Sequence, residues 1–319
     1  MLRENFPEIS QLDLPGYEVT YSRSGRTFAT RILAQIPKIF RAISREREWL
    51  RKTHATHQFD LVISDNRYGL KIDGLKSVIM THQLQIMTGF GFGADWLLRK
   101  LHYRILEKFD ECWVVDREES GGLAGALSHP IHLPVNARYV GLLSQMRPVA
   151  NATPIENGRI LILLSGPEPM RGILEQKLLQ QLARLDKYHF HIIAGNPAGA
   201  APILVSANVT YATHANANDL TLAITGAELV VCRSGYSTLM DLAVLGKKAL
   251  LVPTPGQSEQ VYLAKHLQEA GLFLTREQAH LELEKDIPEA LRYPGFEKPV
   301  TRESEHINEV IDLVLKNLK

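Results

Sequence analysis

A run of small and charged residues separates two short apolar segments in the second half of the chain, within VVCRSGYSTLMDLAVLGKKALLVPTPGQSEQ (230–260). The apolar segments 228–232 and 248–252 have the length of strands in a parallel sheet, and one crossover helix fits between them. In an open parallel sheet, ligands bind beyond the carboxyl ends of the strands, where loops meet helix N-termini. Residues 234–238 lie at such a joint, so their backbone N–H groups and the helix dipole predict a seat for a phosphate.

Individual side chains at this joint have separate expected roles. Gly235 gives the turn a residue without a side chain, and Ser237 or Thr238 is expected to cap the helix that starts there. Asp241 falls about one turn inside the helix, on the face of Ser237, where its carboxylate can accept two hydrogen bonds from a ribose diol. The same residues suit a purely structural role equally well, as a capped helix with Asp241 interacting with the helix dipole.

The loop after the next strand adds groups suited to a sugar. Residues 253–256 form a stiff turn with two prolines and a glycine, and the following helix opens with Gln257, Glu259 and Gln260. Amide and carboxylate groups match sugar hydroxyls, which both donate and accept hydrogen bonds. The two adjacent strand ends therefore predict a site that binds a phosphate, accepts hydrogen bonds from a diol and recognises the hydroxyl groups of a sugar.

The segment 230–264 resembles the donor-binding region of the MurG-like glycosyltransferases, the family of the peptidoglycan enzyme that adds N-acetylglucosamine to a lipid-linked acceptor. That family has an Arg-Ser-Gly turn, an acidic residue that holds the ribose of a UDP-sugar, and a pair of glutamines at the sugar. The residues of this chain at those positions are Arg233, Ser234, Gly235, Asp241, Glu259 and Gln260. Aspartate in place of glutamate shortens the reach to the ribose, and Glu259 replaces one glutamine.

The resemblance implies a GT-B fold, in which two Rossmann-like, doubly wound α/β domains face a cleft. It implies an inverting enzyme that transfers a hexosamine or hexose from a UDP-sugar to an unknown acceptor, with lipid-linked acceptors among the candidates. Helix N-termini would stabilise the leaving diphosphate, so no metal and no cofactor are expected. Two alternatives stay open, an enzyme like UDP-N-acetylglucosamine epimerase and a catalytically inactive protein that binds nucleotide sugars.

Further donor contacts are expected at other strand ends of the second half. Ser165 and Gly166, in LLSGPEPMRG, resemble the Gly-Gly-Ser loop of the family but lack its full glycine doublet, so an ordinary turn fits them equally well. His214, in YATHANAND, is a weaker candidate for a contact with the base, because exposed loop histidines usually have no such role.

The first half supplies the candidates for the catalytic base. LVISDNRYGL and SVIMTHQLQ place Asp65, Asn66, His82 and Gln83 after two predicted strands. A sugar transfer needs a base near the acceptor hydroxyl, and Gln83 stands where the family has a carboxylate that can take a proton. Asp65 and His82 therefore remain as catalytic candidates, although turn capping and a simple strand-end hydrogen bond explain them equally well.

Alternating apolar strands and helices predict two successive α/β domains. We expect an acceptor-side domain over 1–145 and a nucleotide-sugar domain over 158–319, joined by a Pro-, Asn- and Thr-rich linker. Helices are predicted at 27–54, 95–109, 169–185, 259–270, 275–283 and 303–318. Strands are predicted at 60–64, 77–81, 111–115, 159–164, 190–194, 209–212, 228–232 and 248–252. The family opens with a strand and a glycine-rich loop that this chain does not present, so the first domain is expected to be incomplete and transfer to be slow.

Composition and charge restrict the partners. A formal net charge of +1 gives no general basis for binding nucleic acid, and two cysteines fit buried, reduced thiols of a cytoplasmic protein. Basic and apolar residues alternate at near-helical spacing over 23–52, and aromatic residues and glycines mix in IMTGFGFGADWLL (86–98). Both segments suit either a peripheral contact at the inner face of the cell membrane or burial within the fold.

Overall fold

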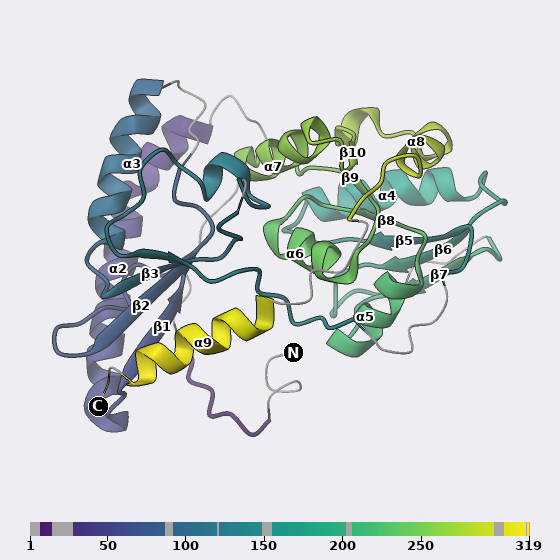
Figure 1. Cartoon of the computed structure of the whole chain (residues 1–319). Helices are drawn as coiled ribbons and strands as arrows, with labels where there is room; N and C mark the ends of the chain where they lie inside the picture. The colour runs from purple at the N-terminus through teal and green to yellow at the C-terminus, as the bar shows by residue number, and fades with distance from the viewer. Residues whose placement is uncertain are drawn as a thin grey trace. The chain divides into compact units, whose positions relative to one another are not determined.

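A computed structural model of the chain describes residues 7–14, 28–86, 92–119, 121–148, 155–201, 206–296, 303–316 and 318. The chain divides into two compact units, each built around one parallel sheet (Figure 1). The first unit is Ile9–Leu143 with Arg302–Lys319, and the second is Ser144–Thr301 with Met1–Glu8. The change of unit thus falls at Ser144, and the last helix returns to the first unit, whereas the sequence predicts that 303–319 stays with the second domain.

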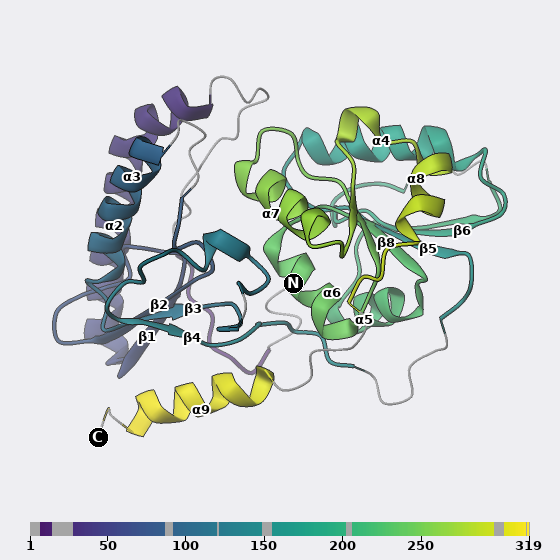
Figure 2. The ribbon, with the colours of Figure 1, turned by 45° about the horizontal axis from the view of Figure 1, so that its top comes forward.

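The first unit is a four-stranded parallel sheet with the strands in chain order. Its strands are β1 (Leu61–Asp65), β2 (Lys76–Thr81), β3 (Glu111–Val114) and β4 (Ala137–Tyr139). Its helices are α2 (Phe28–His57), α3 (Phe92–Leu106) and α9 (Glu303–Lys316). Every predicted strand and helix of this half is confirmed within a few residues, while the three-residue β4 was too short to predict. Helices α2 and α3 lie side by side in Figures 1 and 2.

A buried carboxylate fixes α2 to the turn that follows β1. Glu46 is 2% exposed and accepts hydrogen bonds from Nε of Arg67 at 2.5 Å and from the backbone N–H of Gly69 at 2.9 Å. Gly69 passes so close to α2 that a Cβ there would lie 2.4 Å from the carbonyl oxygen of Ile43. This contact holds the carboxyl end of β1 against the helix behind it.

The second unit is a doubly wound parallel sheet of six strands, ordered β10-β9-β8-β5-β6-β7. Its strands are β5 (Arg159–Leu163), β6 (His189–Ile193), β7 (Val209–Ala212), β8 (Leu229–Cys232), β9 (Ala249–Leu251) and β10 (Leu274–Thr275). Its helices are α4 (Met170–Leu182), α5 (Ala217–Gly226), α6 (Tyr236–Leu245), α7 (Ser258–Glu269) and α8 (Leu283–Ala290). The winding reverses between β5 and β8, and in such sheets ligands bind at the carboxyl ends of the strands at that point.

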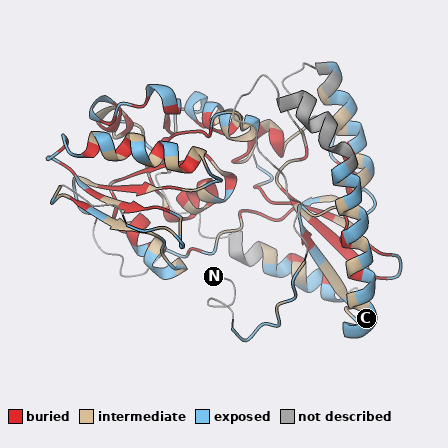
Figure 3. Cartoon of the chain, turned by 180° about the vertical axis from the view of Figure 1, so that it is seen from behind, coloured by how far each residue is buried: buried red, intermediate tan, exposed pale blue. Residues whose placement is uncertain are grey.

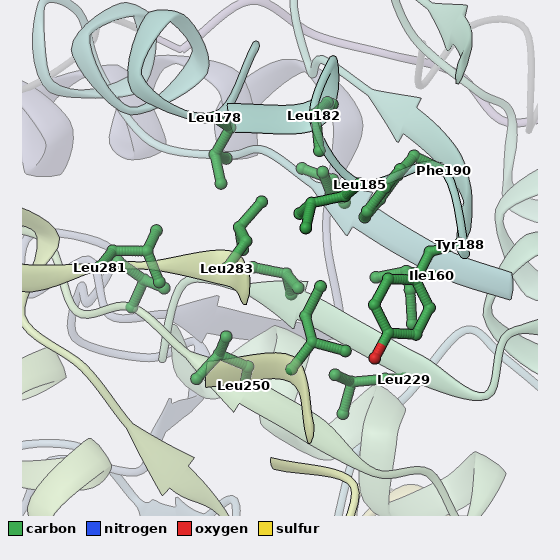
Figure 4. Packing of buried hydrophobic residues seen from close by; sticks show 14 of the residues in the cluster. Ile160, Leu178, Leu182, Leu185, Tyr188, Phe190, Leu229, Leu250, Leu281 and Leu283 are labelled. Carbon is green, nitrogen blue, oxygen red and sulfur yellow. The ribbon is translucent and has the colours of Figure 1, made fainter. Parts of the chain in front are cut away.

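The main core of the second unit lies between the sheet and the helices α4 and α8 (Figure 4). Alternate residues of the strands, among them Ile160 and Leu229, point to this side and meet Leu178 and Leu182 of α4 and Leu283 of α8. The neighbouring strand residues point to the opposite face and are buried there as well, which gives the continuous buried runs seen in Figure 3. The strand ends are therefore held by packing on both faces.

Two predictions of secondary structure in this unit fail. The helix predicted at 275–283 is wrong: the chain forms β10, a 3-10 turn at Gln278–His280 and then α8. Extended backbone here buries Leu281 in the core and lets Leu283 donate its N–H to Oε1 of Gln181 at 2.7 Å. Helix α5 was not predicted, although its cap Asn216, which accepts from the N–H of Asp219 at 2.9 Å, is a readable start signal.

Both cysteines are buried and unpaired, as predicted. Burial raises the pKa of Cys112 and of Cys232 to about 12, so both thiols stay protonated and unreactive near neutral pH. Within the described residues, no helix combines the length and the apolar character that crossing a bilayer requires.

Gly69→Ala should destabilise the protein strongly, because the added methyl group overlaps the backbone of α2. We expect a loss of about 3 kcal/mol in the free energy of unfolding, measured by urea denaturation. Gly93→Ala is the matched control, since Gly93 lies in α3 with open space around its Cβ position, and it should leave stability unchanged or slightly higher. Equal stability of the two variants would contradict the close approach of the turn to α2.

Candidate functional site

The first turn of α6 lies directly after β8, beside the point where the winding of the sheet reverses. Its N-cap is Gly235, which offers no side chain to accept from the first N–H groups, and its first turn holds no acidic residue. The helix starts at Tyr236, so the predicted cap at Ser237 or Thr238 is wrong, because both residues already lie inside the first turn. Ser237 is exposed and Thr238 is half-buried. The positive end of the helix dipole therefore has no anionic partner in this turn.

Gly235 is not required by the backbone conformation of the turn. Its φ of −71° and ψ of 140° are ordinary extended values that any residue adopts. The nearest atom to a Cβ at this position would be Nε2 of Gln260, at 4.0 Å. The glycine thus adds no side chain between Gln260 and the helix start, and the absence of a side chain favours close approach by a ligand.

Hydrogen bonds hold the start of α7 against this turn. Oγ of Ser234 donates to the carbonyl oxygen of Gln260 at 2.8 Å, and Oε1 of Gln260 accepts from the N–H of Thr254 at 2.9 Å. Because its oxygen is committed, Gln260 presents its amino group, a hydrogen-bond donor, toward Gly235. Gln257, the N-cap of α7, and Glu259, in its first turn, are half-buried beside it.

Arg233 is directed into the fold. It is 1% exposed, and its guanidinium donates to the carbonyl oxygens of Val252 (3.1 Å), Pro253 (3.2 Å) and Met170 (2.9 Å) and to Oε1 of Gln278 (2.7 Å). Burial lowers the pKa of Arg233 to about 10, which still leaves it charged at neutral pH. These bonds tie the ends of β8 and β9 to the start of α4, while a direct contact of Arg233 with a ligand stays a prediction.

Asp241 has a partner that the sequence did not reveal. Its Oδ1 accepts a hydrogen bond from Oγ of Ser144 at 2.6 Å, and the same hydroxyl accepts from the N–H of Met146 at 3.0 Å. Burial raises the pKa of Asp241 to about 6, although the bond from Ser144 acts in the opposite direction. Ser144 lies 97 residues away in the sequence, so no local pattern marks the pair.

The loop after β5 differs from the turn at α6. Gly166 has a φ of +97°, which favours glycine, and it is exposed next to the half-buried Ser165. The carboxylate of Glu168 accepts from Nε of Arg171 at 2.7 Å and from the N–H of Gly172 at 3.1 Å. The chain therefore supplies its own anion to the first turn of α4, which favours α6 as the seat for a phosphate.

The first unit brings its two catalytic candidates to neighbouring strand ends. Asp65 ends β1 and is exposed, His82 follows β2 and is half-buried, and β1 and β2 are paired parallel neighbours. Asn66, at a φ of +52°, bonds through Nδ2 to Oδ1 of Asp65 at 3.3 Å, and the N–H of Gln83 bonds to Oγ1 of Thr81 at 3.0 Å. The roles of Asp65 and His82 as bases stay predictions.

His214 follows β7, at the far edge of the second sheet from β8, and is exposed. The structure thus does not bring it next to the α6 turn. Its predicted contact with a base stays a prediction.

A buried carboxylate at the end of β3 organises the loop beside these candidates. Asp116 is 0% exposed and accepts from the N–H groups of Arg117 (2.8 Å), Leu123 (2.7 Å) and Ala124 (2.9 Å) and from Oγ of Ser128 (2.6 Å). Asp116 is not among the residues predicted from the sequence, although an aspartate just after an apolar strand is a recognisable signal for such a loop.

Comparison with known proteins finds matches for the second half of the chain. Residues 170–314 match the Glycosyltransferase family 28 C-terminal domain. Two similar curated proteins are UDP-N-acetylglucosamine--N-acetylmuramyl-(pentapeptide) pyrophosphoryl-undecaprenol N-acetylglucosamine transferases. The one from Pasteurella multocida is 31% identical over 164 residues, and the one from Vibrio campbellii is 32% identical over 163 residues. Each alignment covers 47% of this chain and 45% of the relative, so the match spans less than half the length of these relatives.

Similar solved structures cover nearly the whole chain. The glycotransferase of kitacinnamycin has a TM-score of 0.66 at 14% identity, over 93% of this chain and 85% of that one. The spinosyn rhamnosyltransferase SpnG complexed with thymidine diphosphate has a TM-score of 0.60 at 14% identity, over 92% and 82%. These matches confirm the GT-B fold with Rossmann-like domains, and the sequence matches confirm the resemblance to MurG-like glycosyltransferases.

Asp241→Asn should stabilise the protein at neutral pH. Since the folded-state pKa of about 6 lies above the ordinary carboxyl value of 3.8, the stability that protonated Asp241 contributes is lost as pH rises from 3.8 through 6. We expect the free energy of unfolding at pH 7 to rise by about 1–3 kcal/mol. The difference should vanish near pH 4, where the aspartate is mostly neutral in the folded protein. Chemical denaturation at both pH values measures it, and a variant less stable than wild type at pH 7 would contradict the raised pKa.

Proposed function

We propose that this chain, whose residues 170–314 match the family 28 domain, is a glycosyltransferase that uses a UDP-sugar as donor. One observation carries the proposal. The first turn of α6 has no side-chain cap, lies behind an unobstructed glycine, and has a donor amide and a carboxylate on either side. A nucleoside diphosphate carries the phosphate charge and the ribose hydroxyls that these groups match.

In this proposal the donor diphosphate binds at the first turn of α6, over Gly235. The ribose diol bonds to Asp241, and the sugar hydroxyls meet Gln257, Glu259 and Gln260. Arg233 and Ser234 act indirectly, by holding the starts of α6 and α7 in position. A UDP-linked hexosamine or hexose is the proposed donor because the similar curated proteins are named for UDP-N-acetylglucosamine.

The proposed reaction inverts the anomeric carbon. A base, Asp65 or His82, removes the proton of an acceptor hydroxyl, whose oxygen attacks the anomeric carbon while the bond to UDP breaks. UDP departs with the electron pair of that bond, and the positive end of α6 stabilises the charge that develops on it. The acceptor is a hydroxyl compound, and we include lipid-linked ones because the curated relatives carry pyrophosphoryl-undecaprenol in their name.

We propose a peripheral membrane contact through α3, at the cytoplasmic face. Trp96, Leu97 and Leu101 are 47%, 53% and 45% exposed, and Nζ of Lys100 lies 5.3 Å from the centre of the Trp96 ring. Apolar side chains interleaved with cations suit the boundary of an anionic bilayer. The predicted basic segment at 23–52 and the aromatic run at 86–98 lie partly outside the described residues.

Gly235→Val should abolish donor binding and leave the fold intact. Valine adopts the backbone angles of Gly235 without strain, but its methyl groups fill the space before α6. We expect wild type to bind UDP in calorimetry, and the variant to bind it at least tenfold more weakly, with unfolding parameters unchanged. Gly93→Ala, which removes a glycine of α3, is the control and should bind UDP like wild type. Wild type that binds no UDP or UDP-sugar would refute the proposed function, and full binding by Gly235→Val would move the phosphate away from α6.

Trp96→Ser combined with Leu97→Ser should weaken binding to vesicles that contain anionic phospholipid. We expect wild type to sediment with such vesicles at low salt and to be released at high salt, because salt screens surface charge. The double variant should sediment several-fold less at low salt. Leu315→Ser, which removes a leucine of α9 that is 46% exposed, is the control and should sediment like wild type. Equal sedimentation of all three proteins would exclude α3 as the contact.

A further inference from the structure

We propose that Ser144 is a positioning residue that fixes the carboxylate of Asp241, and through it sets the preference of the site for ribose over deoxyribose. This inference rests on the proposed function, because it takes the ligand of Asp241 to be the sugar of a nucleoside diphosphate. It adds a residue outside the segment 230–264, which carries the resemblance to known transferases.

The hydroxyl of Ser144 has a fixed orientation. A serine hydroxyl has one proton, and at 2.6 Å from Oδ1 of Asp241 that proton is committed to the carboxylate. The N–H of Met146, at 3.0 Å, donates to a lone pair on the same oxygen. The N–H of Met146 therefore fixes the hydroxyl of Ser144, and that hydroxyl fixes the carboxylate of Asp241.

The bond fixes the direction from which the carboxylate can accept from a ligand. Ser144 uses one lone pair of Oδ1, so Oδ2 and the second lone pair of Oδ1 can accept from the two hydroxyls of a diol, and rotation of the carboxylate about its Cβ–Cγ bond would break a short hydrogen bond. A carboxylate held in this way recognises a diol at one distance and in one direction. A freely rotating carboxylate would accept from any nearby hydroxyl and discriminate less.

The position of Ser144 supports a dedicated role. It is the first residue of the long segment Ser144–Thr301 of the second unit and lies outside the strands and helices, yet its side chain bonds to Asp241 in the middle of α6. A purely structural tether between this segment and α6 is the competing explanation. A tether affects stability and the binding of all ligands alike, whereas a positioning residue affects the comparison between two ligands that differ by one hydroxyl.

The experiment compares UDP with 2′-deoxy-UDP by calorimetry on the full chain. We expect wild type to prefer UDP, and Ser144→Ala to weaken UDP binding about five- to tenfold, which corresponds to the loss of one ordinary hydrogen bond. Binding of 2′-deoxy-UDP should change less, so the preference for UDP should shrink. Ser144→Thr keeps a hydroxyl and should restore the preference. In a protein that already carries Asp241→Asn, adding Ser144→Ala should not change the preference for UDP over 2′-deoxy-UDP any further.

Controls separate the possible outcomes. Ser44→Ala removes a hydroxyl that donates to the carbonyl oxygen of Phe40 within α2, and it should leave both affinities unchanged. Ser144→Cys, nearly the same size as serine but a weak donor, replaces Ser144→Ala if the alanine variant does not fold. If wild type binds UDP and the Ser144 variants prefer UDP over 2′-deoxy-UDP as strongly as wild type does, the role of Ser144 is wrong. The proposed function is then unaffected. Wild type that binds no UDP overturns both.

Discussion

Every α-helix begins with backbone N–H groups that have no partner inside the helix, and the second unit depends on how these groups are satisfied. Helix α5 uses the side chain of Asn216, and α4 uses the carboxylate of Glu168. Helix α6 starts from Gly235, which has no side chain. Of these three consecutive helices, α6 is thus the one whose N-cap residue has no side chain, and it is the one that follows β8 beside the reversal of the sheet.

An open helix start is useful only if the loops around it are rigid, and a buried arginine provides that rigidity. Arg233 is 1% exposed, and its guanidinium donates to four acceptors, which lie after β9, at the start of α4 and in the 3-10 turn at Gln278–His280. Burying a cation is costly unless its N–H groups have hydrogen-bond partners. Displacement of any of these segments would therefore leave the buried guanidinium with fewer partners. The arginine therefore ties the ends of β8 and β9 to the start of α4, and in the proposed function it would act on a ligand only through the backbone that it holds.

Sequence and structure agree where the information is local. Buried strands, the Gly235 turn and the helices around them follow from apolar runs and turn residues, and nearly all were predicted within a few residues. The failures have physical causes. Residues 275–283 carry a helical pattern, yet burial of Leu281 and a hydrogen bond from the N–H of Leu283 to Oε1 of Gln181 keep the chain after the 3-10 turn extended. The partners of Asp241 and Arg233 lie far away in the sequence, and Glu168 reads as an ordinary loop residue until its carboxylate is seen against α4.

Asp241 brings stability and function into conflict. Its carboxylate is half-buried, and its pKa of about 6 means that the folded chain at neutral pH keeps a charge that it would be more stable without. A core selected for stability alone would replace it with a neutral side chain of the same shape. Ser144 supplies one hydrogen bond that reduces this cost, and a ligand diol would supply the rest. If Asp241 binds a diol as proposed, relief of this cost would contribute to the binding energy, and the proposed function would then explain an acidic residue in a position that packing alone would make apolar.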